Sequence, residues 1–135
     1  MSLTAKKSLF IFLFTVSCDQ SFGQIINPTH VAYIGGIDNG PVKRGFFLAQ
    51  QGVGAMRKIT MEHWEHITVD SFSVIIKRDT SVVYQYRNKG NLFENDLQAI
   101  FKDLRNNDTV LIFDINATDL DRKHIYISPL EYKIE

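Results

Sequence analysis

Hydrophobic and polar positions alternate with a period of two over a long stretch in the middle of the chain. The alternation runs from Ile67 to Ile76, but its phase changes at Asp70-Ser71. One extra residue that exchanges the two faces of a strand forms a β-bulge, so a single bulged strand is predicted here. A second alternating run follows a polar connection, and the two runs together predict a hairpin over Phe72–Arg87.

The pattern changes to a helical period after this hairpin. Apolar residues from Phe93 to Leu104 recur on one stripe, which predicts one amphipathic helix. Asn106-Asn107 can close this helix, because asparagine tolerates the left-handed conformation. The apolar run Val110–Ile115 alternates little, so it predicts a central strand that is covered on both faces.

Shorter segments complete the pattern. Val31–Ile34 predicts a strand, and residues 125–134 predict strand material around Pro129, which marks a sheet edge or a bend. Residues 44–50 stay open between a short helix and a strand, because two phenylalanines and a glycine favour neither. We therefore predict a mainly β (α+β) fold, an antiparallel β-sandwich-like domain with one amphipathic helix packed on it.

The N-terminal segment has the pattern of a secretory signal peptide. Lys6-Lys7 precede the apolar run Leu9–Val16, which is too short to span a membrane, and small residues stand near Gly23. We predict cleavage after Gly23, so that residues 1–23 are a signal peptide and residues 24–135 form a single domain. The product would be exported through the inner membrane and be periplasmic or secreted.

Cys18 supports an alternative in which the chain is a lipoprotein. Thr15–Cys18 is a loose lipoprotein cleavage box, and lipidation of Cys18 would tether the protein to a membrane. Cys18 is the single cysteine of the chain, so no internal disulfide can form.

Composition restricts the classes of function. The chain has 135 residues, of which 44% are hydrophobic, and 15 basic residues balance 15 acidic ones. This length fits one folded domain, and this hydrophobic content argues against disorder. The neutral balance gives no basic footprint, so nucleic acid is not an expected partner.

Two glycine- or aspartate-rich segments resemble ligand loops without completing them. Gly35–Gly40 has the glycine spacing of a phosphate loop, but Pro41 and Val42 follow where lysine and serine or threonine are needed, so a plain turn is predicted. Asp119–Asp121 begins like a calcium loop, but Lys123 occupies a ligand position, and an exposed hairpin turn is predicted instead. We predict no cofactor, no metal site and no catalytic residue.

His63 and His66 carry the alternative of a small exported metal-dependent hydrolase, with a nearby carboxylate as third group. Two histidines three residues apart meet on a helix but point to opposite faces of a strand. The segment leads directly into the strand that begins near Ile67, which favours divergent side chains.

Several pieces of the chain, in order, resemble the C-terminal domain of GldM, a gliding-motility and type IX secretion protein. The matching pieces span residues 31–135 and are Val31–Gly36, Lys43–Gly45, Leu48–Gln50, Gly52-Val53, Ala55, Val69–Val74, Gly90-Asn91, Asp108–Ile115, Pro129 and Tyr132–Ile134. The order and spacing of these pieces carry the resemblance.

The resemblance implies a β-rich, sandwich-like periplasmic domain that is found in dimers and has no catalytic residues. This chain lacks the membrane anchor and the preceding domains of GldM, so the motor role does not carry over. The expectation is a non-enzymatic interaction module, an accessory of the gliding or type IX secretion apparatus. Its partner would be an envelope protein or a second copy of itself.

Tyr84 and Tyr86 are the candidate partner surface; the alternative is that the hairpin residues form the sandwich core and an ordinary exposed face. The predicted hairpin carries more large apolar side chains than one thin core can accommodate, and tyrosine is favoured where one end is buried and the other is wet. An edge strand with free backbone groups can also pair with another chain.

Overall fold

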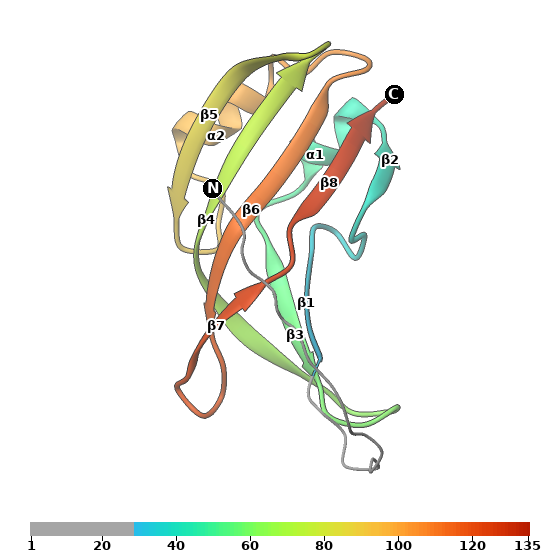
Figure 1. Cartoon of the computed structure of the whole chain (residues 1–135). Helices are drawn as coiled ribbons and strands as arrows, with labels where there is room; N and C mark the ends of the chain where they lie inside the picture. The colour runs from blue at the N-terminus through green and yellow to red at the C-terminus, as the bar shows by residue number, and fades with distance from the viewer. Residues whose placement is uncertain (1–28) are drawn as a thin grey trace.

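A computed structural model gives the fold of residues 29–135 (Figure 1). The predicted signal peptide, its cleavage position and Cys18 lie outside the described residues. The elements are, in order, β1 (Thr29–Tyr33), β2 (Gly40–Val42), α1 (Arg44–Ala49), β3 (Gly54–Lys58), β4 (Trp64–Arg78), β5 (Ser81–Lys89), α2 (Asn95–Phe101), β6 (Thr109–Thr118), β7 (His124–Ile127) and β8 (Leu130–Ile134).

The eight strands of the described part form one curled sheet, shaped like half a barrel (Figure 1). The order is β1-β3-β4-β6-β8-β2, with β5 paired to β4 and β7 paired to β6 beside this path. β2 runs parallel to β8, while the other pairings are antiparallel, so the sheet is mixed. The mainly β class is confirmed. The predicted sandwich differs from this arrangement, because the strands make one continuous mixed sheet, and residues 29–135 hold two short helices instead of one.

β4 bends at the predicted bulge. Burial changes phase between Val69 and Phe72, both of which are buried, and the ladder with β6 is irregular in the same place. The prediction of a phase change at Asp70-Ser71 is therefore confirmed. β3 pairs with β4 before the bend and β5 pairs with it after the bend, so the bend separates two parts of the sheet.

β6 has a matching irregularity at Asp114, whose φ of 50° lies in the left-handed region. The guanidinium of Arg87 spans both bends. It donates to the hydroxyls of Ser71 and Ser73, at 2.7 and 2.8 Å, and to the Asp114 carboxylate at 3.0 Å. Arg87 thus holds the two central strands together where both leave regular geometry.

Both helices lie on the same side of the sheet, which we call the inner face (Figure 1). Aromatic rings fill the space between helices and strands. The ring centroids of Phe47 and Phe101 are 5.0 Å apart, those of Phe93 and Phe101 are 4.9 Å apart, and those of Phe47 and Tyr132 are 5.3 Å apart. Residues 44–50, whose conformation the sequence left open, contain the helix α1. This helix places Phe47 in the aromatic cluster.

The opposite side of the sheet, the outer face, has no helix on it in the described part of the chain. In β6, Val110 and Ile112 are buried on the inner face, while Leu111 and Phe113 are partly exposed. The prediction that this strand is covered on both faces is therefore wrong. A continuous apolar run cannot show which side the helices occupy, and here they occupy one side alone.

Two adjacent glycines shape the turn that follows β1. Gly35 and Gly36 have φ of 55° and 81° in a tight turn between Ile34 and Ile37, so the predicted plain turn is confirmed. The hydroxyl of the buried Tyr132 donates to the Ile37 carbonyl at 2.6 Å, and this bond ties the turn to β8.

Gly52 allows two backbone segments, one after α1 and one before α2, to lie very close together. Its neighbours form two backbone hydrogen bonds with the segment before α2, from Val53 N–H to Asn91 O at 2.9 Å and from Phe93 N–H to Gln51 O at 2.8 Å. A Cβ atom at Gly52 would lie 2.1 Å from the Asn91 carbonyl oxygen. The φ of Gly52 lies outside the left-handed region, so backbone conformation does not require glycine here. The requirement is steric, because any side chain would clash with Asn91.

Candidate functional site

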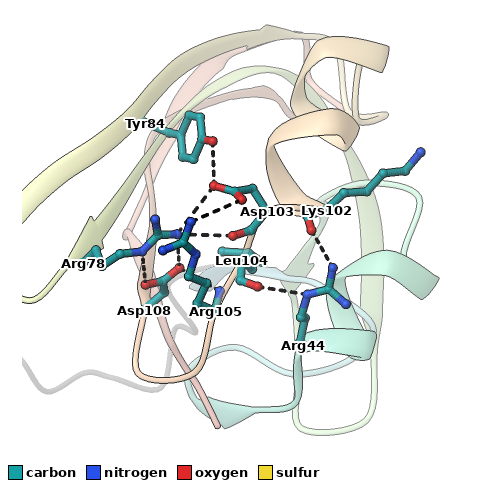
Figure 2. A network of polar contacts seen from close by, with 8 residues as sticks. All are labelled: Arg44, Arg78, Tyr84, Lys102, Asp103, Leu104, Arg105 and Asp108. Carbon is teal, nitrogen blue, oxygen red and sulfur yellow. Dashed lines mark hydrogen bonds and ion pairs between the residues drawn. The ribbon is translucent and has the colours of Figure 1, made fainter.

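Ionised side chains gather where α2 leads into β6, as Figure 2 shows. The guanidinium of Arg78 donates to both oxygens of Asp108, at 3.0 and 2.9 Å, and the Arg105 N–H donates to the same carboxylate. The Asp108 side chain is only 1% exposed. Burial opposes its ionisation, but these donors outweigh burial and hold the pKa of Asp108 below its usual range. The pair is fully engaged within the fold, which indicates a structural role.

The same cluster explains why α2 is shorter than predicted. The helix ends at Phe101, although the predicted stripe extends to Leu104. Arg44 of α1 donates to the carbonyls of Lys102 and Leu104, and Arg78 donates to the carbonyl of Asp103 (Figure 2). These side chains take the carbonyls at the helix end, so the chain turns away there instead of adding another helical turn.

Tyr84 and Tyr86, the predicted partner surface, lie half-buried on the inner side of β5. The hydroxyl of Tyr84 donates to the Asp103 carboxylate at 2.7 Å, and that of Tyr86 donates to the Glu94 carboxylate at 2.9 Å. These hydrogen bonds raise the pKa of both tyrosines. The wet ends of both rings are therefore engaged with the chain's own acids, and a role in partner binding stays a prediction.

The backbone of β5 presents a free edge. Among the described strands, β5 pairs with β4 alone. Gly90 N–H points back to Asp70 O, whereas Lys89 N–H bonds to the Glu94 carboxylate on the other side. Because backbone groups alternate in direction along a strand, those of Gln85 and Arg87 also point away from β4. We call these outward groups the β5 edge.

Apolar side chains lie next to the β5 edge. Val82 and Val83, at the end of β5 where its register with β4 shifts, are 52% and 37% exposed. On the outer face beside them, Ile75 of β4 is paired with Leu111 of β6, and both are partly exposed. Ile75 is paired with Gln85 of β5, so this apolar pair adjoins the β5 edge.

His63 and His66 do not share one strand, because His63 lies in the turn before β4 and only His66 belongs to the strand. His63 stands just before β4, and its Nε2 atom lies 3.4 Å from the Glu65 carboxylate. His66 is paired with Met56 and follows Glu65 in β4, so its side chain points to the face opposite that of Glu65, near which His63 lies. No group of three or more His, Cys, Asp or Glu side chains in residues 29–135 is arranged to hold a metal ion.

Asp119 and Asp121 belong to the turn between β6 and β7, where the sequence predicted a hairpin turn. One oxygen of Asp119 accepts the N–H groups of Asp121 and Lys123, each at 2.9 Å, and these bonds lower the pKa of Asp119. Arg57 of β3 bonds to Asp121 at 3.2 Å and to Glu65 at 2.9 Å. Arg57 therefore fastens this turn to the β3–β4 ribbon and contributes to the curl of the sheet.

Sequence reasoning missed Arg57, Arg78 and Asp108. The oppositely charged side chains to which they bond lie between 8 and 64 residues away along the chain. No local pattern marks such pairs, because opposite charges are common on any surface.

The sequence matches none of the protein-family models with which it was compared, and no curated protein is significantly similar to it. The likeness to the GldM C-terminal domain therefore stays a prediction. Neither helix of the described part is long and apolar enough to cross a membrane.

Proposed function

We propose that this chain is a non-enzymatic protein-interaction module of the cell envelope, which acts after export to the periplasm or the exterior. The observation that carries the proposal is the β5 edge, with its outward backbone groups at Gln85 and Arg87 and the exposed Val82 and Val83 beside it. The resemblance to the GldM C-terminal domain agrees with an accessory role in the gliding or type IX secretion apparatus.

The proposed partner is an envelope protein that adds an extended segment to β5 as a new strand. Main-chain hydrogen bonds to Gln85 and Arg87 would supply affinity, and the valines would contact alternate side chains of the segment. Proteins normally block long edges with proline, short length or charge. β5 spans nine residues without proline. Its charged residues, Arg87 and Lys89, stand toward one end, where Arg87 is engaged with Asp114. Val82 and Val83 leave the other end apolar.

The sandwich-like packing expected from the sequence would arise only in the complex, when the partner packs against the outer face of the sheet. Ile75, Leu111 and Phe113 are partly exposed on the outer face, where a second layer would have to pack. The rest of the partner, beyond the added strand, would cover the part of this face that adjoins β5, where Ile75 is paired with Gln85. The alternative of a metal-dependent hydrolase gains no support, because His63 and His66 diverge.

The decisive experiment places a photo-crosslinking amino acid at Gln85 in the native host and identifies the adduct by mass spectrometry. The crosslinker at Lys133, on β8, serves as the control position. The test variant is Gln85→Pro, which removes an outward N–H that β4 does not use, and Gln85→Ala is its matched control. Proline is tolerated at such edge positions, so Gln85→Pro should remain folded by circular dichroism.

The proposal predicts a discrete adduct from position 85 and none from position 133. Gln85→Pro should abolish partner binding in a pull-down, whereas Gln85→Ala should retain it. Equal binding by the two folded variants would refute strand addition at β5. A wild-type dimer in sedimentation that Gln85→Pro converts to a monomer would instead identify a second copy of this chain as the partner.

A further inference from the structure

A cavity of about 560 Å³ lies between α1 and α2, apart from the β5 edge. Its floor is the aromatic cluster of Phe47, Phe93 and Phe101, each of which is at most 4% exposed. The close approach at Gly52 holds one wall in place, because it joins the segment after α1 to the segment before α2. Cavities of about 300–1,000 Å³ with apolar linings are typical of small-molecule sites.

Two exposed leucines stand on opposite sides of this cavity. Leu48 of α1 is 43% exposed, and Leu92, which precedes α2, is 59% exposed. Single exposed leucines are ordinary on a protein surface, but two that line one cavity over a phenylalanine floor form a continuous apolar wall. An apolar chain of small cross-section would cover both.

One ionisable side chain, Lys102, lines the cavity. Within residues 29–135 it makes no ion pair, whereas the neighbouring Asp103 is bound by Tyr84 and lies near Arg78. Figure 2 shows the Lys102 side chain extending away from the Arg78–Asp108 pair. The cavity therefore combines an apolar interior with one positive charge that the described part of the fold does not neutralise.

Three glutamine amides, those of Gln50, Gln51 and Gln98, add polar groups to the lining. The Nε2 atom of Gln98 donates to the Phe93 carbonyl at 2.9 Å, so that bond fixes the orientation of this amide. Gln51 is exposed on the opposite wall. Gln98 lies four residues before Lys102 on the same side of the cavity, so its amide is the nearer hydrogen-bonding partner along α2 for a polar head group.

We propose that this cavity binds an apolar molecule that ends in a carboxylate. The apolar chain lies over the phenylalanine floor between Leu48 and Leu92, and the carboxylate pairs with Lys102. Charge complementarity selects this chemistry: an uncharged apolar ligand leaves the lysine unpaired, and a small anion leaves the apolar walls exposed. The site is separate from the β5 edge and does not depend on the function proposed for that edge.

The test is calorimetric titration of the purified chain with decanoate below its micelle concentration. Decan-1-ol, which lacks the charge, and acetate, which lacks the chain, are the ligand controls. The variant is Lys102→Gln, and Lys89→Gln, which removes a lysine on β5, is the matched control. Circular dichroism verifies that both variants are folded.

Saturable binding of decanoate at one site is expected, with acetate not binding. Loss of one charge-assisted hydrogen bond should make Lys102→Gln about tenfold weaker, while Lys89→Gln binds like the wild type. The side-chain amide signal of Gln98 in the nitrogen-15 spectrum should shift on binding. Absence of saturable binding, equal affinity of Lys102→Gln and wild type, or decan-1-ol binding as tightly as decanoate would each overturn the proposal.

Discussion

Replacing Gly52 with alanine tests the packing that joins the two halves of the inner side. The new methyl group would lie 2.1 Å from the Asn91 carbonyl oxygen, which is a backbone atom and cannot rotate away. The two segments must separate, and the hydrogen bonds of Val53 and Phe93 on either side of Gly52 lengthen or break.

The size of the effect follows from these contacts. Two backbone hydrogen bonds contribute about 1 kcal/mol each, and overpacking of a tight site costs about 1–3 kcal/mol. Because relaxation relieves part of the clash by breaking the bonds, the two costs overlap. We expect the free energy of unfolding to fall by about 2–3 kcal/mol, which corresponds to a melting temperature lower by about 10–15 °C in a domain of this size.

Gly45→Ala is the matched control. Gly45 lies in α1 without a left-handed φ, and a methyl group added there would meet no atom within 4 Å. Alanine there should raise stability by up to about 1 kcal/mol, because it restricts the unfolded chain and favours the helix.

Urea unfolding followed by circular dichroism measures both variants, and amide hydrogen exchange locates the change. In Gly52→Ala, the Val53 and Phe93 amides should lose protection first. If Gly52→Ala unfolds at the same urea concentration as the wild type, the close approach at Asn91 does not constrain the fold and the reasoning fails.

Two further predictions concern the dependence of stability on pH. Burial raises the pKa of Tyr132, so the stability it contributes is complete below the ordinary tyrosine pKa of about 10 and is lost as pH rises through the raised value. Tyr132→Phe also leaves the Ile37 carbonyl without its donor, so it should lower the free energy of unfolding by about 1 kcal/mol at neutral pH. In urea titrations the loss of stability at alkaline pH should become shallower. An unchanged alkaline profile would contradict this assignment. The pKa of Asp108 is lowered, so its contribution is present above a pH of about 4 and is lost as pH falls through the lowered value. Asp108→Asn should therefore lower the free energy of unfolding by about 2–3 kcal/mol at pH 7. It should also flatten the acid side of the stability–pH profile, which thermal melts between pH 2 and 7 measure. A variant as stable as the wild type at pH 7 would exclude an important Arg78–Asp108 pair.

Local patterns predicted the features that depend on neighbouring residues. The period-two alternation and its phase change identified the β4–β5 hairpin and the bend of β4. This was possible because burial of one strand face makes apolar and polar residues alternate along the sequence. The helical stripe identified α2 but overestimated its length. Phe93 and Leu104 are buried, as the stripe requires, yet both lie outside the helix, since burial does not by itself specify helical backbone.

Long-range pairing could not be predicted in the same way. β2 is three residues long and contains Pro41, so no alternation marks it as a strand that pairs in parallel with β8. The cavity between α1 and α2 was also missed, because the sequence left the conformation of residues 44–50 open. Recognising it requires α1 as a helix and the close approach at Gly52, and both depend on tertiary contacts.

The position of β8 has a consequence for the order in which the parts of the domain can fold. β8 comes last among the described strands, yet it lies between β6 and β2 and supplies the buried Tyr132 and Ile134. Contacts of this region span 92 and 95 residues, as in the bonds to Asn39 and Ile37. Folding that waits for such distant partners is slow, so the β2–β8 side of the sheet closes after the local β4–β5 hairpin can form.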